Sequence, residues 1–162
     1  IQDARLYSSK SGFTIDTFYV LDENYQPLSH EPGRLNAVRK ALEDELKLVD
    51  HYSEVVRRRT PRQLKQFATP TRTSIHTAPG ANVSVLEVIS PDRPGLLATI
   101  GRIFMDLGVR LQNAKISTLG ERVEDIFFVT DQNKQPLTDP DFCARLQQTL
   151  CRELDLQVEK DI

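Results

Sequence analysis

The sequence has few of the residue types on which metal and redox sites depend. Its 162 residues include two cysteines, three histidines and no tryptophan. Cys143 and Cys151 fall eight positions apart in a segment with helical periodicity. That spacing separates them by about 12 Å, too far for a disulfide bond. We therefore expect two reduced thiols that pack along one helix, and a cytoplasmic protein.

The chain also lacks the motifs that catalytic sites require. His30, His51 and His76 show no paired ligand spacing, and there is no glycine-rich phosphate loop or nucleophile elbow. Glu124 and Asp125 are adjacent, but consecutive side chains of a strand point to opposite faces, so these carboxylates cannot converge on one substrate. We expect no catalytic residue, no metal site and no cofactor within this chain.

Long hydrophobic runs are absent as well. No apolar stretch approaches the roughly 18 to 20 residues of a membrane helix, and the N-terminus shows no secretory signal. Hydrophobic residues make up 39% of the chain and charged residues 27%, which is typical of globular proteins and excludes wholesale disorder. The length fits one ordinary domain or two small ones, with no membrane partner.

Basic residues gather in one segment of an otherwise acidic chain. Residues 51–82 carry six basic and one acidic side chain, and five of the six basic ones lie between Arg57 and Lys65. The net charge of −2 and the lack of a basic-aromatic pattern around Phe127 and Phe128 argue against an RNA-binding sheet. We expect this connector to contact the neighbouring domains, with no nucleic-acid partner. RNA binding therefore ranks behind the two functions that are given at the end of this section.

The most informative feature is an internal repeat. Asp16–Leu28 (DTFYVLDENYQPL) and Asp125–Leu137 (DIFFVTDQNKQPL) are identical at eight of thirteen positions, at an offset of 109. Just upstream, residues 1–6 parallel residues 111–116. Chance is a poor explanation for this agreement, so the chain contains two copies of one unit.

The second copy predicts a complete α+β unit. Its apolar residues alternate between strand and helical spacing, and Gly108 follows the first helical segment as a C-terminal glycine would. The order βαββαβ predicts a ferredoxin-like antiparallel sheet with two helices on one face. The expected strands are residues 83–89, 109–118, 122–130 and 156–158, and the expected helices are residues 94–107 and 139–154.

The first copy is truncated, because it begins inside the strand equivalent to residues 111–116 and so lacks the first strand and first helix. A helix is expected over 35–49 and a last strand over 71–77. The predicted domains are the truncated first repeat (1–78, with the basic connector 57–67), a linker (79–82) and the complete second repeat (83–162). We expect the natural chain to extend upstream. We also expect the first repeat to be completed by the second or by another chain, through edge pairing.

One loop of the second repeat combines turn residues with the chemistry of a ligand site. In SPDRPGLL (Ser90–Leu97), a proline and an N-cap candidate fit a helix start. The N–H groups of a helix N-terminus also attract a carboxylate, and the nearby Asp92 suits an ammonium group. An amino acid carries both groups, and Asn113 could read a side-chain amide. The candidate effector-binding residues are Asp92, Pro94, Gly95, Leu96, Leu97 and Asn113.

The strand followed by DRPGLL resembles the ACT domain, a βαββαβ module that binds small effectors, often amino acids. The stretch SPDRPGLLATIGRIFMDLGVRLQNAKISTLGERVEDIFFVTD (Ser90–Asp131) is more specifically similar to the C-terminal ACT domain in the family of bacterial protein-PII uridylyltransferase/uridylyl-removing enzymes. The segment RRRTPRQLKQF (57–67) is similar to the join between the two ACT domains of that family. The resemblance covers essentially the whole chain.

This resemblance implies a regulatory region with no catalysis of its own. In that family a nucleotidyltransferase domain uses Mg²⁺ to transfer UMP from UTP to the PII signal protein, a hydrolase domain removes UMP, and glutamine favours removal. The expected function is glutamine sensing in nitrogen regulation, with PII as the parent enzyme's target and with ACT domains that pair within one chain or between chains. The alternative is an ACT module of another amino-acid-controlled metabolic enzyme, or a non-catalytic adaptor.

Overall fold

The computed structural model describes residues 1–9, 11–22, 24–28, 32–48 and 69–160, and it shows the α+β architecture that the sequence predicts. One antiparallel sheet of six strands runs through both repeats in the order β2-β1-β5-β6-β4-β3. The elements are β1 (Asp3–Ser8), β2 (Thr14–Tyr19), α1 (Pro32–Glu45), β3 (Arg72–His76), β4 (Ser84–Pro91), α2 (Leu96–Asp106), β5 (Arg110–Leu119), β6 (Arg122–Thr130) and α3 (Pro140–Lys160).

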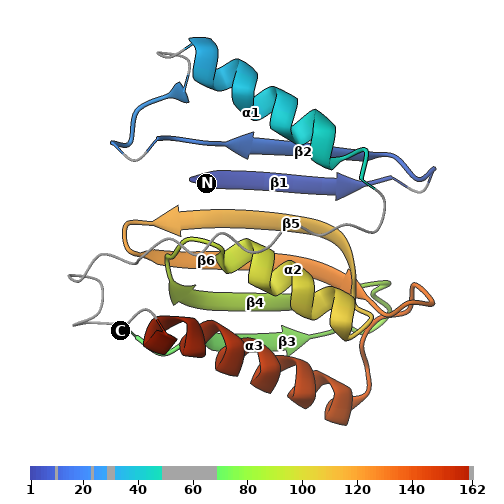
Figure 1. Ribbon diagram of the computed structural model, residues 1–162. Helices are drawn as coiled ribbons and strands as arrows, with labels where there is room; N and C mark the ends of the chain where they lie inside the picture. The colour runs from blue at the N-terminus through green and yellow to red at the C-terminus, as the bar shows by residue number, and fades with distance from the viewer. Residues whose placement is uncertain (10, 23, 29–31, 49–68, 161–162) are drawn as a thin grey trace.

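The core lies in the second repeat, where α2 and α3 cover one face of the sheet (Figure 1). Every fourth residue of α3 points to the sheet, and Leu146, Leu150 and Leu154 are fully buried there. The rings of Phe104 on α2 and Phe127 on β6 meet edge to face, with 5.4 Å between centroids. This packing fixes α2 above β6 and therefore fixes where the start of α2 lies.

The last strand of the second repeat differs from the expectation. Residues 156–158, expected to begin a strand, belong to α3. The place beside β4 is taken by β3, which pairs antiparallel with it from Arg72↔Ile89 to His76↔Val85. The strand expected at 71–77 is therefore present, but it pairs with the second repeat. Because β3 occupies the edge of β4, the end of the chain has no strand edge to join there.

The two repeats are joined through β1 and β5. These strands pair antiparallel from Asp3↔Ser117 to Tyr7↔Asn113, which makes one continuous sheet of the two repeats within this chain. Ala4 is completely buried at the join. Since β1 and β5 are equivalent strands of the repeat, and Asp3↔Ser117 and Tyr7↔Asn113 are reciprocal pairs, the antiparallel pairing relates the two units by a pseudo-two-fold axis between these strands.

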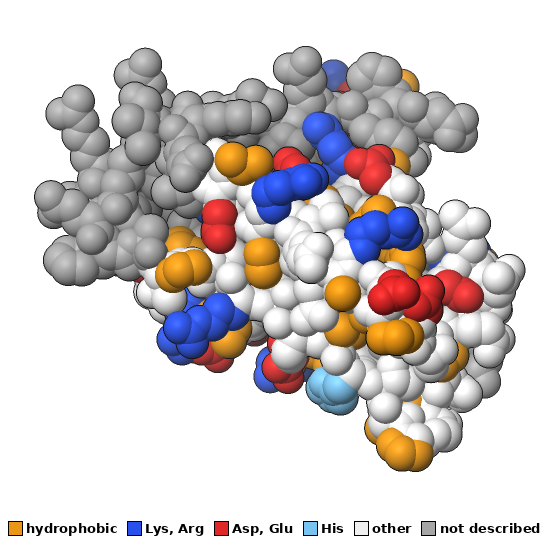
Figure 2. Space-filling view, turned by 90° about the horizontal axis from the view of Figure 1, so that it is seen from below, with side chains coloured by type: hydrophobic (Ala, Val, Ile, Leu, Met, Phe, Trp, Pro, Cys, Tyr) orange, Lys and Arg blue, Asp and Glu red, His pale blue; other side chains and the backbone are white. Residues whose placement is uncertain are grey.

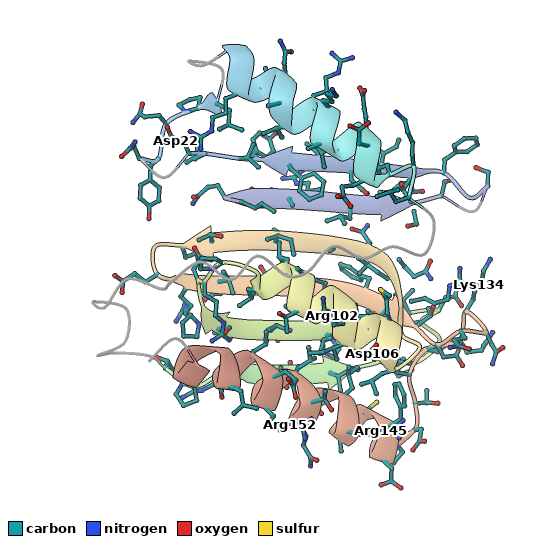
Figure 3. The ribbon with its side chains drawn as sticks, in the orientation of Figure 1. Asp22, Arg102, Asp106, Lys134, Arg145 and Arg152 are labelled. Carbon is teal, nitrogen blue, oxygen red and sulfur yellow. The ribbon has the colours of Figure 1, made fainter. Side chains whose placement is uncertain are left out.

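The loop that follows β2 and the equivalent loop that follows β6 have the same hydrogen bonds, as their identical residues predict. Asp22 Oδ1 accepts backbone N–H groups from Asn24 and Gln26, each at 2.8 Å. Asp131 Oδ1 does the same with Asn133 and Gln135, also at 2.8 Å. Figure 3 labels Asp22 in one loop and Lys134 in the other, at opposite ends of the sheet. The repeat is thus a structural duplication as well as a sequence one.

The first repeat leaves an apolar face uncovered by any described residue. All described side chains of β2 and α1 are exposed, and the described residues of the first repeat include no counterpart of β4 or α2 to pack on them. The basic connector 57–67 and its predicted contacts fall outside the described residues. The large exposed apolar side chains of this region include Tyr7, Phe13, Ile15, Phe18, Tyr19, Leu35, Val38 and Leu42.

Candidate functional site

The loop from β4 to α2 is held by hydrogen bonds at its start. The backbone N–H of Asp92 donates to the carbonyl of Glu121 in the β5–β6 turn at 2.8 Å. Arg93 is buried, and one of its Nη atoms donates to Ser90 Oγ at 3.0 Å. These contacts hold the loop at the end of the sheet where β4 ends and the β5–β6 turn lies.

The helix after this loop starts later than the sequence predicts. Gly95, with φ of 80°, is the N-cap residue in the left-handed conformation, and no side chain caps the helix. Pro94 lies before the helix rather than in its first turn, and Asp92 does not act as the cap. The reason is the left-handed turn at Gly95, which glycine adopts without the steric cost of a Cβ atom.

The uncapped start of α2 leaves backbone donors available to a ligand. Thr99 N–H donates to the carbonyl of Gly95 at 2.9 Å, as in a regular first turn. The N–H of Leu96 donates to the carbonyl of Arg93 at 3.4 Å. The N–H of Leu97 lies in the first turn, where a helix has no intrahelical acceptors. Together with the positive end of the helix dipole it suits an anionic group such as a carboxylate.

Asn113 lies far from this loop. The strand register places Pro91 beside Arg122, whereas Asn113 pairs with Phe128, which pairs with Val85 near the opposite end of β4. Six residues separate Val85 from Pro91, which corresponds to about 20 Å along a strand. The structure therefore brings together Asp92, Pro94, Gly95, Leu96 and Leu97 but not Asn113.

The start of β1 lies at the same end of the sheet as the loop, with β5 and β6 between β1 and β4. Gln2 Nε2 donates to the carbonyl of Thr118 at 3.0 Å, and Thr118 Oγ1 donates to the carbonyl of Ile1 at 3.0 Å. Figure 1 shows the N-terminus at the end of the sheet where β5 ends and α2 begins. Sequence reasoning missed Gln2. The equivalence of residues 1–6 and 111–116 could have indicated it. If these two equivalent strands pair antiparallel, Gln2 comes to the end of the sheet where β5 ends.

A buried carboxylate lies beneath the start of α2. Asp125, on β6, is 1% exposed, and its Oδ1 accepts the backbone N–H of Ser117 at 3.2 Å. Among the described residues, its Oδ2 is buried without a hydrogen-bond partner. Burial raises the pKa of Asp125 to about 7, and the negative charge of Asp92 adds to this rise, while the hydrogen bond from Ser117 opposes it.

Asp125 was considered in the sequence only as a neighbour of Glu124. The two side chains do point to opposite faces, as predicted, since Glu124 is partly exposed and paired with Arg122 while Asp125 is buried. The signal for Asp125 was an acidic residue at a core-facing position between Val123 and Phe127. Such a residue is uncommon in a core unless it is paired, because burial disfavours its charged form.

Other kinds of site find little support in the described part of the chain. Among those residues, no three His, Cys, Asp or Glu side chains come together to hold a metal ion. Cys143 and Cys151 are free thiols on α3. In Figure 2, acidic and basic side chains lie interspersed on the visible face rather than in one basic patch. No helix in the described ranges is both long and apolar enough to cross a membrane.

Comparison with known proteins gives a match to the ACT domain family over residues 84–143. The chain is 53% identical over 154 residues to a bifunctional uridylyltransferase/uridylyl-removing enzyme from Ectopseudomonas mendocina, covering 95% of this chain and 17% of the relative. The Pseudomonas aeruginosa enzyme of the same name is 52% identical over 161 residues, covering 99% and 18%. That of Pseudomonas fluorescens is 49% identical over 162 residues, covering 100% and 18%.

The chain therefore spans less than a fifth of the length of these curated relatives. No solved structure matches the chain. The ACT match begins at the first residue of β4 and ends within α3, so it contains the loop 92–97 and Asp125. Residues 84–143 thus form an ACT domain, and the chain over nearly its full length is similar to a segment of the bifunctional uridylyltransferase/uridylyl-removing enzymes.

Proposed function

We propose that this chain is the glutamine-sensing region of a bifunctional uridylyltransferase/uridylyl-removing enzyme. The observation that supports the proposal most directly is the uncapped start of α2, with Asp92 beside it. Its N–H groups suit the carboxylate of an amino acid, and the carboxylate of Asp92 suits the ammonium group. The high identity to enzymes of that name supports the choice of parent enzyme.

The proposal extends to the enzyme that this region would regulate. Glutamine bound at the loop 92–97 would favour removal of UMP from the PII signal protein over its transfer from UTP. The Mg²⁺ needed for transfer would be held by the catalytic parts of the longer cytoplasmic protein. An ACT domain of this kind acts by preferring one conformation of its parent, and the ligand supplies the difference in free energy.

Calorimetry on the whole chain with glutamine, glutamate and a panel of other amino acids tests the proposal. Glutamine should bind in preference to glutamate, and Asp92→Ala should weaken binding roughly ten- to hundredfold, the effect of losing one charged hydrogen bond. Asp106→Ala is the matched control, because Asp106 is an exposed acidic residue at the far end of the same helix (Figure 3) and should leave the affinity unchanged.

Two results would contradict the proposal. The first is the absence of any preference for glutamine over glutamate, and the second is unchanged affinity in Asp92→Ala. Selective binding of a different amino acid would instead favour the alternative, an ACT module of another amino-acid-controlled enzyme or adaptor. The same calorimetric titrations thus distinguish a glutamine sensor from an ACT module that responds to another amino acid.

A further inference from the structure

We propose that Asp125 is a specificity-determining residue of this site, and that its buried Oδ2 receives the ammonium group of the bound amino acid. This inference rests on the proposed function and makes it more specific. The ligand's carboxylate would lie at the N–H groups of α2, and its ammonium group would lie between the carboxylates of Asp92 and Asp125. Since Asp125 is 1% exposed, the start of α2 would have to move aside on binding.

The sheet geometry places Asp125 under the start of α2. In the register, Asp125 pairs with Val88 of β4, three residues before β4 ends at Pro91. Alternate residues of β6 face the helices, and the next such residue along β6 is Phe127, whose ring contacts Phe104 of α2. Because α2 runs back over the sheet from the Pro91 end, the residues before Phe104 lie over Asp125.

Asp125 has one hydrogen bond among the described residues. Its Oδ1 accepts the Ser117 N–H, and its Oδ2 is buried without a hydrogen-bond partner there. Asp125 pairs with the buried Val88 on β4, and the titratable Asp92 in the loop acts on its charge.

This arrangement favours a cationic ligand. Two carboxylates close enough to raise the pKa of one of them repel each other when both are charged. A buried carboxylate is also costly without a partner. A single ammonium group between them would remove both penalties, and it would leave the ligand's carboxylate free to face the start of the helix. The helix N-terminus alone would select any anion, whereas the added carboxylates select an amino acid.

The first repeat offers a natural control. Asp16 is the counterpart of Asp125, but it is exposed on β2. Asp16→Asn therefore makes the same chemical change in the same repeat position without a site. Substitution at Asp125 by asparagine keeps the shape of the side chain and an oxygen for the Ser117 N–H, while it removes the charge.

The experiment measures affinity for glutamine and for glutaramate, which is glutamine without the α-amino group. The wild-type chain should bind glutamine at least tenfold more tightly than glutaramate. Asp125→Asn should lower that preference roughly tenfold, since Asp92 still contacts the ammonium group, and Asp16→Asn should retain it. A purely structural effect of Asp125→Asn would weaken both ligands alike and leave their ratio unchanged, which would overturn the inference.

A second measurement needs no variant and applies even if Asp125→Asn fails to fold. An ammonium group beside Asp125 stabilises its charged form, so glutamine should release about half a proton per site at pH 7, where a group of pKa about 7 is half protonated. Calorimetry in buffers of different ionisation enthalpy measures this release, and it should fall to about a tenth of a proton at pH 8, where a group of pKa about 7 is already mostly ionised.

The outcomes separate the inference from the function on which it rests. Absence of any amino-acid binding by the wild-type chain would contradict the proposed function and the inference together. Glutamine binding without proton release at pH 7, or with an unchanged ligand ratio in Asp125→Asn, would leave the function standing and overturn the assignment of Asp125.

Discussion

Ser84 Oγ accepts a hydrogen bond from the backbone N–H of Leu137 at 2.8 Å, and so joins the start of β4 to the end of the loop that follows β6. Both residues are buried, and Ser84 Oγ also lies within hydrogen-bonding distance of Thr77 Oγ1. Leu137 lies at the end of the repeated loop, three residues before α3 begins at Pro140. The bond therefore links the first strand of the domain to the segment that leads into its last helix.

Ser84→Ala should therefore lower the free energy of unfolding by about 1–3 kcal/mol, since it leaves a buried N–H without an acceptor. Urea unfolding followed by circular dichroism measures the change. Ser74→Ala is the matched control, because Ser74 is exposed on β3 and its hydroxyl donates to Glu87 of the neighbouring strand β4. This substitution should change the free energy of unfolding by less than about 0.5 kcal/mol. Equal effects of the two substitutions would contradict this account of Ser84.

Gly108 ends α2 in the left-handed conformation, with φ of 69°. A Cβ atom there would collide with the side chain of Gln132. We expect Gly108→Ala to cost about 1–2 kcal/mol of stability, from the left-handed backbone alone, with any additional cost set by how far Gln132 can move.

The control for Gly108 lies in the same helix. Gly101 is in the middle of α2, and a Cβ atom there would meet no atom within 4 Å. Gly101→Ala should stabilise the protein by about 0.5–1 kcal/mol, because alanine has the higher helix propensity. Thermal unfolding of the two variants should thus give melting temperatures on opposite sides of the wild type, and a lower value for Gly101→Ala would count against the packing described here.

The buried carboxyl of Asp125 predicts how stability varies with pH. Its folded pKa, about 7, lies above the ordinary value of 3.8, so the folded state binds more protons than the unfolded state between these values. Stability attributable to this group is therefore full below pH 4 and is lost as the pH rises toward 7. Asp125→Asn should remove this dependence, so its stability relative to the wild type should increase between pH 5 and pH 8.

Urea unfolding of both proteins at several pH values checks this expectation, with Asp16→Asn as the control that should follow the wild type at each pH. The comparison uses the difference between the two proteins, so it cancels the titration of all other groups. A constant difference between Asp125→Asn and wild type from pH 5 to pH 8 would show that the carboxyl is not held in its neutral form.

Sequence patterns sufficed where the structure depends on local periodicity and on the repeat. The spacing of Leu146, Leu150 and Leu154 fixed the buried stripe of α3, because residues four apart lie on one face of a helix. The identical residues of the two loops led to identical hydrogen bonds at Asp22 and Asp131. Gly108 marked the end of α2, since few other residues adopt its conformation without strain.

The candidate site was only partly accessible from the sequence. The loop 92–97 was found because its turn residues are contiguous, and its actual helix start differed by two residues because Gly95 takes the left-handed turn. Asn113 was placed at the loop on the basis of strand order, but strand register puts it at the other end of the sheet. Gln2 and Asp125 come to this end of the sheet from strands distant in sequence from the loop, so no local pattern could place them there.

The amino-acid sequence by itself determined the repeat, the order of elements and the loop that begins α2, because each follows from residues that are neighbours along the chain. Only the tertiary structure decided which strands share edges. The pairing of β1 with β5 brings Gln2 to the end of the sheet where the loop lies, and the pairing of β3 with β4 leaves residues 156–158 helical. Such pairings depend on which strands still have unpaired backbone N–H and C=O groups when the sheet assembles. This is a property of the whole sheet and cannot be read from any single segment.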